Sequence, residues 1–149
     1  MRAVVQRVSQ AEIEVEGDVI ARMSAGLLVL VGVGIRDEIR DALELARKLV
    51  GLRVFEDEAG RMNRSLLEVG GRLGLVSQFT LYGDVRKGRR PFFGEAAAPD
   101  RARLLFDRLR LACEASGVSV VTGRFGARMK VSLVNEGPVT ILLDTQRAF

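Results

Sequence analysis

The chain has 149 residues, no histidine and one cysteine, and its 23 Lys and Arg against 19 Asp and Glu give a formal net charge of +4. Catalytic triads with a histidine base are excluded, because no imidazole can take the proton of a serine or cysteine nucleophile. Zinc sites made of His and Cys are excluded as well, since Cys113 alone cannot supply four ligands. The acidic residues form no recognisable ligand pattern, so we expect no metal and no other cofactor.

Hydrophobic residues make up 48% of the chain, which suits one domain with a continuous core, here expected over residues 1–149. No apolar run approaches the roughly 20 residues that cross a bilayer, and the first residues alternate in polarity, unlike a signal peptide. We therefore expect a cytoplasmic protein with no membrane partner. Cys113 lies in a helical pattern, where a small buried side chain is expected.

The first half of the chain predicts several strands and then a helix. The segments expected to be strands are residues 2–8, 13–15, 19–21 and 27–33. Asp37 is expected to cap a helix that runs to about Val50, with Gly51 placed to end it. The residues expected on the inner face of this helix are Ile39, Leu43, Ala46 and Val50.

The second half predicts further strands around one more helix. The segments expected to be strands are residues 52–55, 73–81, 118–122, 129–134 and 139–143. Pro99 suits the first turn of a helix that runs toward Gly117, with Leu105 and Leu109 inward. Strands arrive in runs without regular βαβ alternation, so we predict an α+β fold with a mainly antiparallel, barrel-like sheet and two helices.

Gly32-Val33-Gly34 follows a predicted buried strand and precedes a predicted helix, as a dinucleotide-binding fingerprint would. The third glycine position is Asp37, however, and a carboxylate there would repel a pyrophosphate. We therefore interpret these glycines as part of a tight turn between strand and helix.

Ser77-Gln78-Phe79-Thr80 places hydroxyl groups, an amide and backbone N–H groups at the end of a predicted strand. A serine or threonine without an adjacent base is a poor nucleophile, whereas N–H groups and Gln78 could stabilise an oxyanion at any pH. The alternative is structural, with the Ser and Thr side chains bonding to neighbouring backbone.

Gly137-Pro138 lies between two predicted strands and favours a hairpin turn. The same dipeptide could instead form a rigid corner of backbone whose carbonyl groups press against a ligand. A separate segment concentrates charge, because Arg86, Lys87, Arg89 and Arg90 fall within five positions. This basic loop is either a solvated loop or a contact for phosphate groups.

Ser77-Gln78-Phe79-Thr80-Leu81 and Asn135-Glu136-Gly137-Pro138-Val139-Thr140 resemble the two signature motifs of the D-aminoacyl-tRNA deacylase family, of the bacterial and eukaryotic type. The resemblance extends along nearly the whole chain. Further matching segments are Gln6-Arg7-Val8, residues 26–30, Arg89-Arg90-Pro91, residues 122–125 and residues 131–134.

This resemblance implies a homodimeric hydrolase that cuts the ester between a D-amino acid, or glycine mischarged on tRNA(Ala), and the acceptor end of tRNA. It implies rejection of L-aminoacyl-tRNA by a cis Gly137–Pro138 unit that enters the active site of the partner subunit. The family relies on the 2′-hydroxyl of its substrate, with N–H groups near Phe79 and Thr80 stabilising charge.

The resemblance also implies supporting roles for three residues. Arg7 would support the Gly137–Pro138 unit, Phe125 would stack on adenine, and Met129 would contact substrate. With tRNA as the substrate, the cations of the basic loop become expected phosphate contacts. The competing interpretations are an RNA-binding module without catalysis, which the 5% aromatic content disfavours, and a small-molecule ester or amide hydrolase on the same fold.

Overall fold

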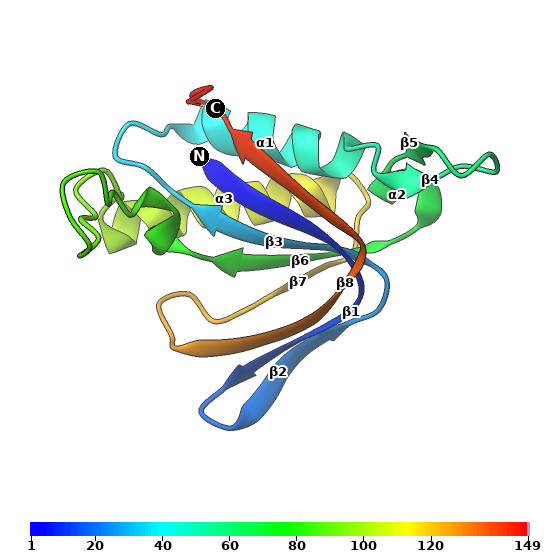
Figure 1. Ribbon diagram of the computed structural model, residues 1–149, viewed down its shortest axis with the longest axis horizontal. Coiled ribbons are helices and arrows are strands. Elements are labelled where there is room, and N and C mark those ends of the chain that lie inside the picture. Colours follow the sequence, from blue (N-terminus) through cyan, green and yellow to red (C-terminus); the bar gives the residue numbers. More distant parts are fainter. Residues whose placement is uncertain (149) are drawn as a thin grey trace.

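The computed structural model describes residues 1–148 and shows a strongly bent sheet with two long helices on one side (Figure 1). The strands are β1 (Arg2–Val15), β2 (Asp18–Met23), β3 (Gly26–Gly32), β4 (Phe55–Glu56), β5 (Met62–Arg64), β6 (Arg72–Ser77), β7 (Val120–Thr122) and β8 (Met129–Asp144). The helices are α1 (Ile39–Gly51), α2 (Leu66–Val69), α3 (Pro99–Ala115) and the 3₁₀ turn η1 (Phe79–Tyr82). Within these residues no helix is long and apolar enough to cross a membrane.

The main sheet has the strand order β2-β1-β3-β6-β7, and β8 pairs with β1 outside this path. β1 pairs antiparallel with β2, β3 and β8, whereas the β3–β6 and β6–β7 pairs are parallel. The predicted α+β fold with a mainly antiparallel, barrel-like sheet is confirmed, and the sheet also contains these two parallel pairs. Its parallel pairs arise because α1 lies in the connection from β3 to β6, and α3 lies in the connection from β6 to β7. Each connection returns the chain to the end of the sheet at which the preceding strand began.

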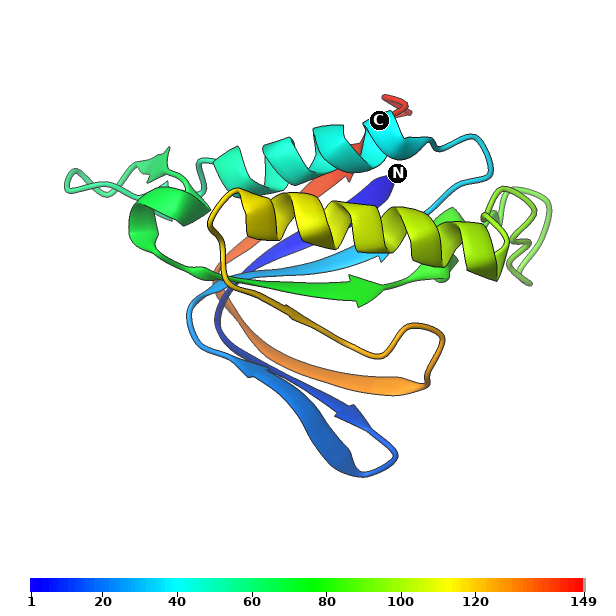
Figure 2. The same ribbon diagram turned by 180° about the vertical axis from the view of Figure 1, so that it is seen from behind.

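Helices α1 and α3 lie side by side on one face of the sheet (Figure 2). Their inner residues, among them Leu45, Leu49, Leu105 and Leu109, form the main core with β1, β3 and β6. A smaller apolar cluster that includes Ile13 lies on the other side, inside the bend of the sheet. Cys113 is buried in the main core, as its helical pattern predicts, and burial raises the pKa of its thiol to about 12.

The predicted inner face of α1 is wrong at two positions. Ile39 and Leu43 are exposed, while Ala42, Leu45 and Leu49 are buried. The helix also begins one residue later than predicted, because Glu38 is its N-cap and forms a capping box with Asp41. Two sets of apolar residues at helical spacing occur in this helix, and the set that contains Leu45 and Leu49 faces α3 and the sheet.

The short helix α2 was not predicted, although its signals are in the sequence. Ser65 at the N-cap accepts a hydrogen bond from the Glu68 N–H (3.4 Å), and the Glu68 carboxylate accepts one from the Ser65 N–H (2.6 Å). Gly70 ends the helix in the left-handed conformation, with φ of 62°. A capping box followed by a C-terminal glycine is a recognisable helix signature.

The predicted hairpin at Gly137–Pro138 is not formed. β8 is one strand from Met129 to Asp144 that contains both predicted strands, and it pairs with β1 on either side of Gly137. The register shifts between Gln6 and Val8, so residues 136–139 bulge out opposite Arg7. The reason for the difference is long-range pairing with β1, which holds both halves of β8 in one strand that bends together with β1 (Figure 1).

Candidate active site

The first signature segment begins at the end of β6, which stops at Ser77 and passes into η1. The Gln78 N–H donates to the Val31 carbonyl (2.7 Å), which fixes the exit of the chain from the sheet. The first N–H groups of a helical turn have no partner within that turn, so those of Phe79 and Thr80 are available to a ligand. The side chains of Phe79 and Thr80 are exposed, whereas Tyr82 at the other end of η1 is buried.

The Thr80 hydroxyl accepts a hydrogen bond from the Gln78 side-chain amide. An amide neither takes up nor releases a proton near neutral pH, so this contact orients the hydroxyl without activating it. The local geometry therefore provides polar groups in fixed positions and no general base next to Thr80.

A cleft of about 610 Å³ opens at this end of β6. Its polar part is formed by Ser77 and Gln78, and its apolar lining includes Phe79, Phe93, Ala97, Phe106, Phe125, Met129 and Val131. These walls are supplied by the end of β6, the start of α3 and the loop after β7. The three segments lie together, at the left of Figure 1 and at the right of Figure 2. An apolar cleft with a few convergent polar groups is the usual form of a small-ligand site.

The structure thus brings together five of the predicted site residues, namely Ser77, Gln78, Phe79, Phe125 and Met129. Two aromatic pairs flank the cleft. Phe79 and Phe93 meet edge to face with ring centroids 5.0 Å apart, and Phe106 and Phe125 are tilted at 6.0 Å. The Arg103 guanidinium lies 4.8 Å from the centroid of the Phe125 ring.

Arg103 is a residue that sequence reasoning missed. It lies in the first turns of α3, and its contact with Phe125 brings a positive charge to an aromatic wall of the cleft. The sequence carries no signal for this contact, because the two residues come from different elements that meet only in the folded chain.

The second signature segment lies outside this cleft, whose lining includes neither Arg7 nor Gly137 nor Pro138. Arg7 is 8% exposed, and its guanidinium donates to the Glu136 carbonyl (3.0 Å) and to the Val54 carbonyl (2.6 Å). The Asn135 carboxamide also braces the bulge, since its oxygen accepts a hydrogen bond from the Val139 N–H (3.1 Å). The backbone around Gly137–Pro138 is therefore held from both sides.

The Gly137–Pro138 peptide bond is cis, and Gly137 has φ of 124°. A Cβ atom at Gly137 would lie 2.8 Å from Nη2 of Arg7 and 2.9 Å from a methyl group of Val139. Glycine is therefore required here by conformation and by space. Arg7 supports the bulge by direct contact with the preceding carbonyl, which is the position that its predicted role needs.

The basic loop has fewer free charges than its sequence indicates. Arg86 makes two side-chain contacts with Asp84, from Nε to Oδ1 (2.9 Å) and from Nη2 to Oδ2 (2.6 Å). These hydrogen bonds hold the pKa of the Asp84 carboxyl well below its usual range. Lys87, Arg89 and Arg90 are exposed. An acidic residue two positions before an arginine in a turn was a sequence signal for this pairing.

A second polar cluster is buried behind η1. The Asp37 carboxylate accepts hydrogen bonds from the Gly34 N–H (2.6 Å) and the Tyr82 hydroxyl (3.2 Å), and it pairs with the α-amino group of Met1 (2.8 Å). Burial, followed by the charge of Asp37, raises the pKa of the Tyr82 phenol above its ordinary value. This cluster fixes the rear of η1, and the glycine turn predicted at Gly34 provides room for it, because a Cβ there would lie 2.7 Å from the Tyr82 oxygen.

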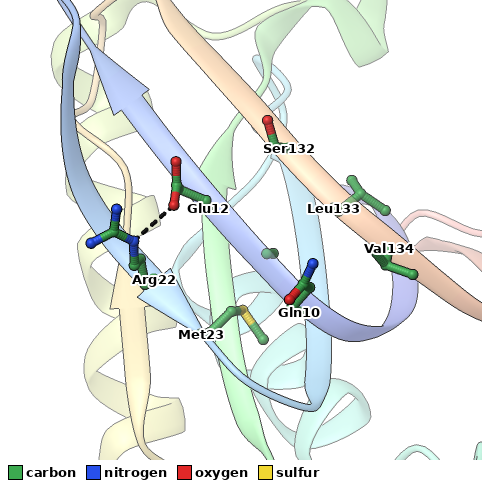
Figure 3. A pocket seen from close by; sticks show the side chains of 8 residues that line it. Gln10, Glu12, Arg22, Met23, Ser132, Leu133 and Val134 are labelled. Carbon is green, nitrogen blue, oxygen red and sulfur yellow. Dashed lines mark hydrogen bonds and ion pairs between the residues drawn. The ribbon is translucent and has the colours of Figure 1, made fainter.

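A groove of about 400 Å³ lies along the bend of β1, β2 and β8 (Figure 3), and Val134 in its lining directly precedes the second signature segment. Glu12 and Arg22 form a cross-strand ion pair at 2.8 Å, and Gln10, Met23 and Ser132 complete much of the lining. None of the predicted site residues lines this groove. The cleft at the end of β6 is therefore the candidate site that five of the predicted residues share.

The family model described as D-Tyr-tRNA(Tyr) deacylase matches residues 4–144. The chain is 54% identical over 149 residues to a D-aminoacyl-tRNA deacylase of Thermosipho africanus, and the match covers 100% of both chains. It is 57% identical over 150 residues to a D-aminoacyl-tRNA deacylase of Kosmotoga olearia, again over 100% of both. A solved structure described as c-Myc DNA Unwinding Element Binding Protein has a TM-score of 0.92 and 36% identity, covering 97% of this chain and 99% of that one.

Proposed function

Because the chain belongs to the D-Tyr-tRNA(Tyr) deacylase family, it is a hydrolase of D-aminoacyl-tRNA, and we propose that its reaction takes place in the cleft at the end of β6. The observation that carries this proposal is the position of Ser77–Thr80, where the exposed start of η1 meets the apolar cleft. The aminoacyl group would enter the cleft with its ester carbonyl at the N–H groups of Phe79 and Thr80.

Catalysis in this arrangement is electrostatic stabilisation and positioning. The chain has no histidine, and Thr80 is bonded to an amide instead of a base. The 2′-hydroxyl of the terminal ribose would therefore assist the attack, while the protein holds the ester and stabilises the developing oxyanion. Phe125 and Met129 would contact the terminal adenosine from the opposite wall, and Lys87, Arg89 and Arg90 would contact phosphate groups.

Stereochemical selection would come from Gly137–Pro138 of a second subunit. In a single chain these residues do not line the cleft, which supports a role for them in the cleft of another copy. The sheet face beside them also favours self-association. Val139, Ile141 and Leu143 pack against the helix-side core, so alternation places Leu142 on the opposite face, where it is 57% exposed.

In such a homodimer, the braced carbonyl groups near Gly137 would exclude the side chain of an L-amino acid. Glycine has no side chain to exclude, so glycyl-tRNA mischarged on tRNA(Ala) would also be hydrolysed. The substrate is part of translation, and we place the protein in the cytoplasm on that ground.

Incubation of the purified protein with matched D- and L-aminoacyl-tRNA tests the reaction and its selectivity. We expect release of the D-amino acid and none of the L-amino acid. No release of either would exclude the hydrolase, leaving an RNA-binding module as the better interpretation. Release of both would contradict the stereochemical role of Gly137–Pro138.

Mixed dimers test the contribution of the second subunit. One variant would block the cleft (Ala97→Trp) and the other would change the bulge (Gly137→Val), and each is expected to be defective alone. A dimer with one of each has one site with an open cleft and an unchanged partner bulge, so D-selective release should return. If both functions lay within one chain, no mixed dimer would contain an intact site and D-selective release would stay absent.

A further inference from the structure

Phe92 in the basic loop has a side chain that is 70% exposed, more than that of any other large hydrophobic residue among residues 1–148. Only 5% of the chain is aromatic, so an exposed phenyl ring is a notable use of a scarce residue. The packing of the single chain gives no reason for this exposure, since the ring contributes to neither core cluster.

The ring is held in place by its own loop. The Asp84 N–H donates to the Phe92 carbonyl (2.8 Å), and the Phe92 N–H donates to the Asp84 carbonyl (2.9 Å). The ring also lies over Gly94, where a Cβ atom would come within 2.3 Å of it. A fixed backbone and a glycine beneath the ring present Phe92 as a preformed apolar plane at the surface.

This plane is adjacent to the mouth of the cleft. The next residue, Phe93, lines the cleft and contacts Phe79 at 5.0 Å between centroids. Consecutive residues therefore connect the interior of the site to the outer surface. A nucleic acid strand whose terminal residue occupies the cleft must leave it past this loop or past the opposite wall.

The charges around Phe92 favour the route past the loop. Lys87, Arg89 and Arg90 are exposed in the same loop, whereas Arg86 is neutralised by Asp84. Exposed aromatic rings combined with cations that follow a backbone are the features that bind single-stranded nucleic acid without reading its sequence. The acceptor end of tRNA is single-stranded, so it supplies an unpaired base next to the terminal adenosine.

We propose that Phe92 stacks on an unpaired base of the tRNA acceptor end, upstream of the terminal adenosine, while Lys87, Arg89 and Arg90 contact the adjoining phosphates. This inference rests on the proposed placement of the aminoacyl group in the cleft. It assigns Phe92 a positioning role, since the ring touches neither the ester nor the groups that stabilise it.

The test compares Phe92→Ala, Phe92→Leu and Phe92→Tyr with the wild type on two substrates, D-aminoacyl-tRNA and the D-aminoacyl ester of adenosine. Loss of stacking should raise KM for tRNA about tenfold in the Ala and Leu variants, with little change in kcat. The Tyr variant should retain the wild-type KM, and the adenosine ester should be hydrolysed equally by all four proteins. Leu111→Ala, which removes an exposed apolar residue from α3, is the matched control.

Salt dependence separates stacking from charge. Phe92→Ala should weaken tRNA binding at every salt concentration without changing the slope of log K against log salt. Arg90→Ala should flatten that slope by roughly 0.7 for one phosphate of a single strand. A changed slope in Phe92→Ala, or an equal loss on the adenosine ester, would overturn the assignment.

Binding of uncharged tRNA, with and without its unpaired 3′ end, distinguishes the two proposals. If the wild type hydrolyses D-aminoacyl-tRNA and Phe92→Ala behaves like it, only the Phe92 inference fails. If the wild type releases no amino acid but Phe92→Ala loses its preference for the intact 3′ end, the proposed reaction fails and the base contact stands. A Phe92→Ala protein with normal tRNA binding but a smaller assembly in solution would assign the ring to a second copy of the chain and overturn the inference.

Discussion

The two ends of η1 have polar residues of opposite character. At its start, Gln78 and Thr80 are partly or fully exposed, and they bond to each other beside the cleft. At its end, Tyr82 is buried and bonds to Asp37, which is only 1% exposed. A turn of four residues therefore joins a set of exposed polar groups beside the cleft to a buried set that stabilises the fold.

The difference shows how the site can be rigid without being buried. Backbone N–H groups stabilise an oxyanion well only if they do not have to reorganise during the reaction. The buried cluster behind η1 supplies this rigidity, because a network whose members are all satisfied fixes one arrangement. Substitutions behind η1 should therefore act mainly on stability and change activity only where they displace η1, whereas substitutions in front of it should act on activity.

The largest effect is expected for Asp37→Ala. Removing this carboxylate leaves the buried α-amino group of Met1 without its ion-pair partner, with the Thr145 hydroxyl as a remaining acceptor, and takes an acceptor from the Gly34 N–H. Breaking a buried pair in this way costs about 3–5 kcal/mol of the free energy of unfolding. Urea denaturation measures it, and Asp107→Ala on the exposed side of α3 is the control, with an expected change within about 0.5 kcal/mol. Equal losses in the two variants would show that the rear cluster does not stabilise the fold.

A smaller loss is expected for Gly34→Ala. The added methyl group would lie 2.7–2.8 Å from the Tyr82 ring and hydroxyl, so either η1 or the turn must shift. Overpacking of this kind costs about 1–3 kcal/mol. Gly51→Ala provides the matched control, because nothing lies within 4 Å of a Cβ there. If the buried end of η1 holds its exposed end in place, Gly34→Ala should also lower kcat in the protein that remains folded. A displaced η1 would move the polar groups at its start.

Tyr82→Phe should cost about 1 kcal/mol, the usual value of one buried hydrogen bond. It should also change the dependence of stability on pH. The folded chain raises the pKa of this phenol, whereas in the unfolded chain it titrates near its ordinary value of about 10. Above that pH the unfolded state loses the proton first, so the wild type becomes less stable as pH rises. Denaturation curves on both sides of pH 10 should therefore show a steeper decline in the wild type than in Tyr82→Phe.

The smallest effect on stability is expected for Thr80→Ala, within about 0.5 kcal/mol, because the hydroxyl is exposed. Single-turnover hydrolysis of D-aminoacyl-tRNA should fall only modestly, since the backbone N–H group remains in place. Complete loss of hydrolysis with intact tRNA binding would contradict electrostatic stabilisation by backbone groups and favour a direct chemical role for the hydroxyl.

Signals within short stretches of the sequence predicted the helix starts and strand positions that neighbouring residues determine. Pro99 marks the start of α3, and the segments predicted as strands at residues 13–15 and 19–21 lie in β1 and β2. The phase of α1 was ambiguous, because Ile39 and Leu43 are as apolar as Leu45 and Leu49 and only tertiary packing selects between them. The continuity of β8 through Gly137–Pro138 was invisible for the same reason, since β1 is more than a hundred positions away in the chain.

The candidate site shows the same difference between features set by short stretches of sequence and contacts that form only on folding. Both signature segments were recognisable from their residues, but the strand predicted over residues 73–81 ends at Ser77, and residues 79–82 form η1. The contacts between elements could not be predicted, such as those of Arg103 with Phe125 and of Arg7 with the Glu136 carbonyl. Each depends on where a side chain from one element meets another after folding.

The pairing of β1 with β8 has a consequence for how the protein assembles. Arg2 pairs with Asp144 and Gln6 with Thr140, so the first strand made by the ribosome receives one of its neighbours last. Pairings over such a separation form slowly, because most of the chain must be closed into a loop beforehand. Until then β1 has an open edge, and the bulge that carries Gly137–Pro138 has nothing to brace it. We therefore expect the end of β6 and the helix-side wall of the cleft to form earlier in folding than the Gly137–Pro138 bulge and the wall that Met129 and Val131 of β8 supply.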